Sequence, residues 1–535
     1  MRESTIKREF LKDDADRRES LDRARLCSAL TKPWVLPPHG WQEDEKLPET
    51  FSSLAARGIT NLEGRLLLAL FPPGTPFFKL QPAAKFLFDP NTEPEMLQEF
   101  KNILKTHELL IMSHLDRADR QGKSNGRRAG FRSRQRTAIS QLLITGDVLT
   151  QLTDDFTLRV FRRDNYVTRR DTAGDVLYHI IQEKIDPLNL TPDQLMDCDL
   201  DSDVLLEKNP YDRLEFLYTK IEWQPLTKRW IISQECRDKP ITTMEERVTP
   251  FFSVPFELPP GANYGRGLVE QNLGDCRAIN ELTERLLDHA AIASKMLFAL
   301  DYNSQVRPSD LAQPTGSVIQ ARVQQGQITD VGLMKAEKMN DFQVANATRE
   351  SIRKDLSTVM LMEAEQLPTY ERASKFHVQR VAMELEGALG GVYAPIADNM
   401  QIPLIERLRE VLTRKNILPG LPEDAVQVEA ITGLQALSNE GDQQKIMGLL
   451  QTMASMGPET MGRINTGVLL DMLMRQSGIH EPGLIKSEKE IQKELEAQQQ
   501  AMMQQQAQQQ AMQTGGKILE QEVARAPAQE ASPNV

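Results

Sequence analysis

Hydrophobic residues recur every three or four positions along residues 268–293, which predicts an amphipathic helix about 38 Å long at 1.5 Å per residue. The preceding segment, residues 261–267, is too rich in glycine to be helical and is expected to form a turn. The apolar stripe is narrow, so most of the helix surface must face solvent or a partner.

A second helix is predicted from about Met339, where apolar positions again follow steps of three and four. We expect it to end before Leu367 and Pro368, because the residue before a proline is pushed away from helical geometry. Between the two helices, residues 294–338 combine glycines and prolines with short β-prone runs such as 317–323, which predicts a small β-containing connector.

Two long helices with narrow apolar stripes bury little surface on their own. One solution is a ring of copies in which each helical hairpin packs against the next. The other is an ordinary hairpin inside a monomer, and periodicity leaves both open.

The residues before the hairpin change from helical to strand periodicity. Helices are predicted over 8–30 (highly charged), 51–70 and 93–115 (amphipathic) and 138–152 (apolar). Alternating patterns then predict strands over 157–162, 166–170, 176–181, 214–223 and 230–234, with a turn at 171–175. This order predicts an antiparallel α+β domain over residues 1–267, in a chain that is mostly helical.

The residues after the hairpin are predicted to be helical. One long helix is expected from about Arg372 through Leu389 and on toward Leu412. Shorter methionine-rich helices follow over 438–480, and a charged helix begins at Ser487. It passes into a Gln-rich tract from Gln498, where composition does not decide between a coiled coil and disorder.

Composition narrows the class of protein. The 535 residues carry a net charge of −12, so tight phosphate binding by the whole surface is not expected. No run of eighteen apolar residues predicts a transmembrane helix, and the polar N-terminus does not resemble a secretory signal. The four cysteines are scattered, as is typical of reduced cytosolic thiols.

A basic run interrupts the acidic chain. It contains eight cations: Arg117, Arg120, Lys123, Arg127, Arg128, Arg132, Arg134 and Arg136. They could contact phosphates, solvate a helix end or pair with acidic residues of another subunit. We favour a structural role, because Phe131 is the one aromatic residue interleaved to stack on bases.

The usual signatures of catalysis are missing. The chain has neither a phosphate-binding loop of the Gly-x-x-x-x-Gly-Lys-Ser/Thr type nor a His-Glu-x-x-His zinc motif. The seven histidines are dispersed, and the aspartates of 197–203 lack the glycine and the glutamate of a calcium loop. We therefore expect no enzyme activity, no cofactor and no metal site.

Four motifs stand in register along the chain: 54–62 (LAARGITNL) with 66–72 (LLLALFP), 165–171 (NYVTRRD) with 174–177 (GDVL), 264–267 (YGRG) with 273–275 (LGD), and 384–393 (ELEGALGGVY). Together they resemble the portal (head-to-tail connector) proteins of short-tailed bacteriophages. The resemblance covers about residues 30–420, whereas the first forty residues and those beyond about 440 diverge.

This resemblance implies a portal-type subunit assembled as a ring, usually of twelve copies. Its parts would be an α+β wing (1–267), two stem helices (268–293 and 339–366), a clip (294–338), a channel loop and long wing helix (367–439), a helical crown (440–497) and a Gln-rich tail (498–535). The channel loop would be centred on Leu367, Pro368, Thr369 and Tyr370.

The resemblance also implies a function. The ring would occupy one vertex of the capsid in the virion, after synthesis and assembly in the host cytoplasm, and would pass double-stranded DNA during packaging and ejection. Its partners would be the major capsid and scaffolding proteins, the terminase large subunit, tail adaptor or tubular proteins and internal core proteins. No membrane partner is implied.

Cations near the stem are the candidates for contact with DNA in the channel: Lys335, Lys338, Arg349, Arg353, Arg372 and Lys375. Asp275, Glu281, Glu284 and Asp288 would keep the wall repulsive, so that DNA passes without being held. Salt bridges between subunits are the alternative for each of these residues. Alternative functions are a nucleic-acid enzyme such as the packaging motor, or a scaffold or tail-tube protein without a channel that gates DNA.

Overall fold

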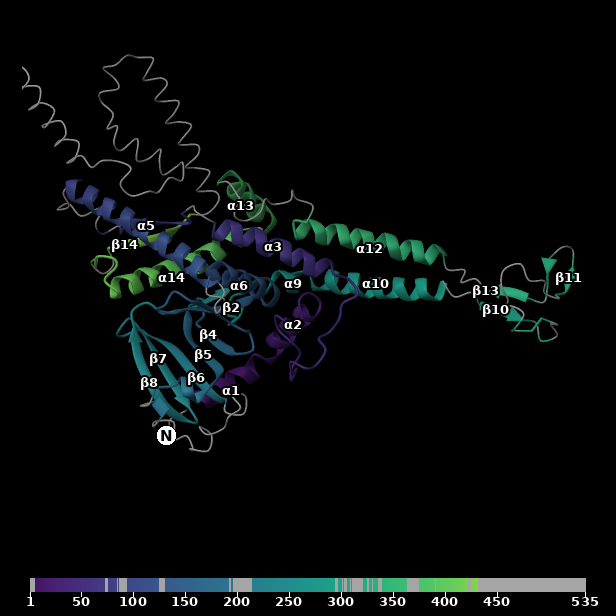
Figure 1. The fold of residues 1–535 in the computed structure, drawn as a ribbon, viewed down its shortest axis with the longest axis horizontal. Helices are drawn as coiled ribbons and strands as arrows, with labels where there is room; N and C mark the ends of the chain where they lie inside the picture. Colours follow the sequence, from purple (N-terminus) through teal and green to yellow (C-terminus); the bar gives the residue numbers. More distant parts are fainter. Residues whose placement is uncertain are drawn as a thin grey trace, which may run out of the picture. The chain divides into compact units, whose positions relative to one another are not determined.

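The protein folds as an α+β chain, as the sequence predicts (Figure 1). The computed structural model describes residues 5–72, 76–83, 85, 94–124, 130–191, 194–195, 214–293, 297–300, 302, 306–307, 309, 321–324, 327–329, 331–334, 339–362, 375–389, 391–421 and 425–431. The predictions for the crown (440–497), the Gln-rich tail (498–535) and the acidic loop (197–203) lie outside these residues.

The N-terminal helices are α1 (Ile6–Asp16), α2 (Arg18–Ala29) and α3 (Leu54–Leu70). The single helix predicted over 8–30 is divided at Arg17. Its buried guanidinium donates to the carbonyl oxygens of Arg163 and Asp164, at 2.7 Å each. These bonds attach the junction of the two helices to the start of strand β4 (Tyr166–Arg170).

Helices α5 (Pro94–Ser124) and α6 (Phe131–Thr145) precede strand β2 (Asp147–Leu152). The helix predicted over 138–152 is therefore wrong beyond Thr145. Gly146 takes the left-handed conformation (φ 81°) that ends a helix, and β2 follows. Strand β2 is buried along nearly its whole length. Its apolar residues Val148, Leu149 and Leu152 do not alternate with polar ones and have the spacing of a helix face, so periodicity does not identify it as a strand.

Strand β2 is the centre of a three-stranded sheet with β3 (Leu158–Phe161) and β9 (Phe251–Pro255). A second, five-stranded antiparallel sheet follows chain order: β4, β5 (Val176–Ile185), β6 (Glu215–Gln224), β7 (Arg229–Cys236) and β8 (Lys239–Glu246). The 171–175 turn is confirmed, since the side chain of Asp171 accepts bonds from the amides of Ala173 and Asp175. Strand β8 was not predicted because it is largely exposed and lacks an apolar face.

The predicted hairpin consists of α9 (Leu268–Gln271), α10 (Leu273–Ala293) and α12 (Met339–Val359). Helices α10 and α12 lie side by side (Figure 1). The first helix is interrupted at Asn272, whose side chain donates back to the carbonyl oxygen of Leu268. Between α10 and α12, β10 (Leu297–Leu300) pairs with β13 (Val331–Met334), and β11 (Val323–Gln324) pairs with β12 (Gln327–Ile328).

Helix α12 ends at Val359, well before the predicted end at Leu367 and Pro368. Leu361 has a positive φ of 50°, and the amide of Met362 donates to the carbonyl oxygen of Ser357 at 2.8 Å. The amide of Leu361 donates to Thr358, so the two bonds form a Schellman cap. The prediction failed because a cap, rather than the proline, ends this helix.

The C-terminal part of the described chain contains α13 (Lys375–Leu389), α14 (Tyr393–Arg414) and β14 (Val426–Ala430), which pairs with β1 (Phe78–Pro82). The single long helix predicted from Arg372 toward Leu412 is thus divided into two, next to Gly391 with its φ of 88°. The main core joins α3, α6, α13 and α14 through fully buried leucines, among them Leu62, Leu142, Leu385 and Leu404.

Candidate nucleic-acid interface on the helical hairpin

The seam between α10 and α12 is narrow, as predicted. Cys276, Ile279 and Leu286 are buried on α10, and Leu356 is buried on α12. Toward the end that precedes β10, the rings of His289 and Phe342 meet at 5.3 Å between centroids. These contacts hold the two helices together but leave their other faces uncovered in a single chain.

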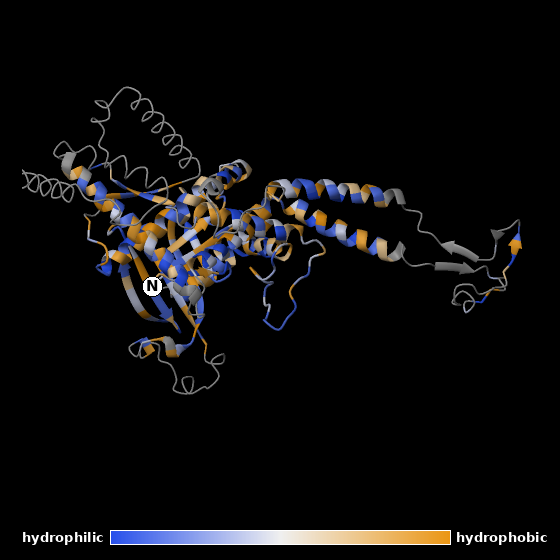
Figure 2. Cartoon of the chain, turned by 45° about the horizontal axis from the view of Figure 1, so that its top comes forward, coloured by the Kyte–Doolittle hydropathy of each residue, from blue (hydrophilic) through white to orange (hydrophobic). Residues whose placement is uncertain are grey.

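The exposed faces of the hairpin carry both charge and large apolar side chains. Leu287 on α10 is 55% exposed and Val344 on α12 is 67% exposed. Figure 2 shows hydrophobic and hydrophilic residues interspersed along both helices. Exposed apolar side chains beside charges are typical of a surface that a protein partner covers.

The glycine-rich turn predicted at 261–267 sets where the hairpin begins. A Cβ atom on Gly146 would lie 2.4 Å from the carbonyl oxygen of Gly265, and one on Gly267 would lie 2.7 Å from that of Leu143. Glycine is required because the backbone of the turn presses directly on the end of α6. This contact fixes the start of α9 against the core.

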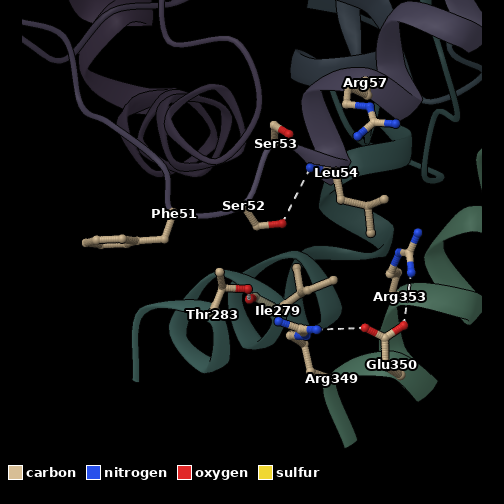
Figure 3. A pocket seen from close by; sticks show the side chains of 10 residues that line it. All are labelled: Phe51, Ser52, Ser53, Leu54, Arg57, Ile279, Thr283, Arg349, Glu350 and Arg353. Atoms are coloured by element: carbon tan, nitrogen blue, oxygen red, sulfur yellow. Dashed lines mark hydrogen bonds and ion pairs between the residues drawn. The ribbon is translucent and has the colours of Figure 1, made fainter. Parts of the chain in front are cut away.

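A polar pocket of about 280 Å³ lies where the hairpin meets the N-terminal end of α3 (Figure 3). Residues 51–54 form one wall, and the amides of Phe51 and Ser52 bond the side-chain oxygen of Asn280 on α10 at 2.8 and 3.2 Å. Ile279 and Thr283 of α10 line a second wall.

Three arginines and one glutamate give the pocket an excess of positive charge: Arg57, Arg349, Arg353 and Glu350. Arg349 and Arg353 donate to the two carboxylate oxygens of Glu350 at 2.7 and 3.0 Å (Figure 3). These hydrogen bonds, that of Arg349 first, hold the pKa of Glu350 below its usual value. Glu350 therefore stays ionised and offsets part of the positive charge.

The structure brings together two of the predicted channel cations, Arg349 and Arg353. Lys335, Lys338 and Arg372 lie outside the described residues, as does the channel loop of Leu367, Pro368, Thr369 and Tyr370. Lys375 is the first residue of α13. Sequence reasoning missed Arg57 as a member of this site, although it lies within the 54–62 motif.

Part of the basic run has a structural role. Arg132 forms ion pairs with Asp116 at 3.0 Å and Asp119 at 3.5 Å. Phe131 is buried and packs edge-on against Phe71, so it is not available to stack on bases. Arg136 pairs with Glu63 at 3.4 Å.

Other predictions concern metals, thiols and membranes. Within the described residues, no group of three His, Cys, Asp or Glu side chains could hold a metal ion. Cys27, Cys236 and Cys276 are buried, and burial raises the pKa of Cys276 to about 11. None of the helices in the described ranges has the length and apolar character needed to cross a membrane.

These features are typical of a structural protein that associates through an exposed helical hairpin, whose surface carries charges of both signs. The chain belongs to the family of bacteriophage head to tail connecting proteins, whose model matches residues 3–485. It is 26% identical to the portal protein of Enterobacteria phage T3 over 500 residues, which span 89% of this chain and 87% of that protein. It is also 26% identical to the portal protein of Escherichia phage T7 over 504 residues, 90% of this chain and 88% of the relative.

Among solved structures, the chain is similar to a protein in the neck of a native gene transfer agent (GTA) particle computed with C12 symmetry. The TM-score is 0.33 at 10% identity, with 74% of this chain and 86% of that chain covered.

Proposed function

We propose that this chain is a phage portal protein, which forms a ring, of twelve subunits, at one vertex of the capsid. The observation that carries the proposal is membership of the head to tail connecting family over residues 3–485. The hairpin supports it, because its narrow seam leaves two long helices in need of packing surface that identical neighbours would supply.

In this proposal the parts of the chain have separate roles. Residues 1–267 form the wing, 268–293 and 339–366 the stem around the channel, and 294–338 the clip that docks the terminase large subunit and later the tail adaptor or tubular proteins. Residues 367–439 supply the channel loop and the long wing helix. Residues 440–497 form the crown toward the capsid interior, with its core proteins, and 498–535 the tail.

The channel must pass duplex DNA without holding it. A basic lining alone would bind phosphates tightly and in a strongly salt-dependent way. Helix α10 carries four acidic residues (Asp275, Glu281, Glu284 and Asp288) and α12 carries both signs, so the stem offers charges of both signs to the channel wall and to contacts between subunits. The role is structural rather than enzymatic. A scaffold or tail-tube protein remains the alternative function.

An assembly experiment tests the proposal. Capsids assembled in cells with major capsid and scaffolding proteins but without this chain should contain no packaged DNA, and adding the chain should restore packaging. Immunogold labelling should then mark one vertex per particle. Labelling over the whole shell or in a tube would indicate a scaffold or tail-tube protein instead.

The channel cations are tested separately. Arg372→Gln should lower the retention of packaged DNA and leave the rings intact, because one phosphate contact per subunit is removed. Lys228→Gln, on the exposed turn between β6 and β7, is the control for loss of one charge. Unassembled Arg372→Gln protein would mean that Arg372 has a structural role.

A further inference from the structure

One side of helix α10 lines the polar pocket at the base of the hairpin. The opposite side of α10 carries a row of acidic residues. We propose that this pocket receives the acidic row of α10 from a neighbouring copy of the chain. The inference rests on the proposed ring and specifies which surfaces meet in it.

The pocket has unused positive charge. Arg349 and Arg353 share one carboxylate, that of Glu350, and Arg57 has no ion-pair partner among the described residues. Three guanidinium groups against one carboxylate leave a net charge of about +2 in a recess of about 280 Å³. In a chain with a net charge of −12, this local excess of cations favours an anionic occupant.

The acidic row consists of Glu281, Glu284 and Asp288. At 100° per residue these positions lie on the face of α10 opposite the buried Cys276, Ile279 and Leu286. Arg277 and Arg285 are exposed on the same face, so the three carboxylates exceed the cations there by one. Glu281 and Glu284 have no ion-pair partner among the residues that the structure describes, and Asp288 has one long contact, 3.8 Å, to Arg285. The row is therefore free to pair with cations of another chain.

Geometry excludes pairing of the two surfaces within one chain. The pocket is lined by Ile279 and Thr283, on the buried side of α10, whereas the acidic row lies on the far side of the same helix. Because the basic pocket and the acidic row lie on opposite sides of α10, pairing them between two copies gives a head-to-tail interface. Repetition of such an interface about an axis closes a ring.

A DNA phosphate is the other anion to consider. Duplex binding uses many phosphate contacts along a continuous basic track. This site is instead one recess, with the ionised Glu350 bonded to two of its three arginines. Each copy of the chain has one pocket and one acidic row, so every pocket in a ring can receive the row of a neighbour. This equal number favours a second copy of the chain over DNA as the occupant.

Charge reversal tests the pairing in the full-length chain. The pocket variant is Arg57→Glu with Arg353→Glu, and the helix variant is Glu281→Arg with Glu284→Arg. Each alone should yield at least ten-fold fewer rings than the wild type in negative-stain images, because like charges then face each other across the interface. The matched control, Lys228→Glu in the exposed β6–β7 turn with Arg229→Glu at the exposed first position of β7, should assemble normally.

Mixing the two variants should restore rings. The reversed pocket of one accepts the reversed helix of the other, while the unchanged surfaces pair as before, so the subunits must alternate. Native mass spectrometry should then find equal numbers of the two variants in each ring. Melting curves followed by circular dichroism should show that both variants remain folded.

The outcomes separate the inference from the proposed function. A wild-type chain that never forms rings overturns both. Wild-type rings together with normal rings of the pocket variant overturn the inference alone, and if those rings retain less DNA, the pocket is a phosphate site. A mixture of folded variants that stays unassembled also overturns the inference.

Discussion

At the scale of single residues, buried polar groups connect the sheets to each other and to the glycine-rich turn. Asp147 on β2 is fully buried, and burial raises its pKa, while the hydroxyl of Tyr166 donates to its Oδ1 atom at 2.8 Å. The guanidinium of Arg163 lies 3.7 Å from the ring centroid of Tyr264, in the turn before α9. The start of the hairpin is therefore tied to both sheets by groups that are costly to leave unpaired.

His179 on β5 should make the protein sensitive to acid. Burial first, and Arg170 second, lower its pKa to about 3, and its Nδ1 atom lies 3.0 Å from the hydroxyl of Thr168. The folded state excludes a proton that the unfolded chain takes up below pH 6.5. This contribution to stability is thus present above pH 6.5 and is lost as pH falls toward 3.

We predict that His179→Asn flattens this dependence. Between pH 7.5 and 4.5 the wild type should lose about 2–3 kcal/mol more of its free energy of unfolding than the variant, at about 1.4 kcal/mol per pH unit below 6.5. Urea titrations of both proteins at the two pH values measure the difference. Parallel pH profiles would show that His179 is protonated in the folded state.

Two glycines of α3 provide a matched pair of substitutions. A Cβ atom on Gly58 would lie 2.0 Å from the sulfur of Met360, at the end of α12, whereas nothing lies within 4 Å of a Cβ atom on Gly64. Gly64→Ala should stabilise the chain by about 0.5–1 kcal/mol, since alanine is the better helix former. Gly58→Ala should destabilise it by about 1–3 kcal/mol through overpacking. Thermal unfolding compares them, and equal shifts would contradict the close contact.

At the scale of elements, the end of α12 is held by α3. The side-chain amide of Asn61 donates to the carbonyl oxygens of Met360 and Leu361, at 3.0 and 2.8 Å. These are carbonyl groups at the helix end that the helix itself cannot satisfy. Asn61 thus completes the cap and fixes the direction in which the chain leaves the hairpin.

Asn61→Ala should weaken this attachment. Loss of two hydrogen bonds to a helix end should lower the free energy of unfolding by about 1–2 kcal/mol. Hydrogen exchange at the amide of Met362, which bonds the carbonyl oxygen of Ser357, should become faster. The neighbouring exposed Thr60→Ala is the control. Unchanged exchange in Asn61→Ala would mean that the backbone cap alone holds the helix end.

The same elements show what sequence patterns can predict. Residues 268–293 and 339–359 were recognised because a half-buried helix shows its period directly. Strand β2 falls within a predicted helix, because a strand buried on both faces shows no alternation of apolar and polar residues. The end of α12 was misplaced, because its cap depends on Asn61, about 300 positions earlier in the chain. Of the three arginines of the pocket, the sequence predicts Arg349 and Arg353 as functional residues but not Arg57. Arg57 lies far from them in the sequence and comes close only in the folded chain.

At the scale of the whole molecule, the proposed function depends on association of identical chains. Helices α10 and α12 share a narrow seam and expose Leu287, Val344, the arginines of the pocket and the carboxylates of α10. A ring would cover these surfaces and leave an axial opening for DNA. Because the proposed contacts between copies are charged, assembly should weaken at high ionic strength, where screening shortens the reach of exposed charges to about 3 Å at 1 M salt.

The most direct test of the central claim is electron microscopy of the purified full-length chain. We expect closed rings with an open centre, in which the hairpin of each subunit packs against the next. A stable monomer with residues 268–362 enclosed in its own interior, or an assembly without a central opening, would contradict it.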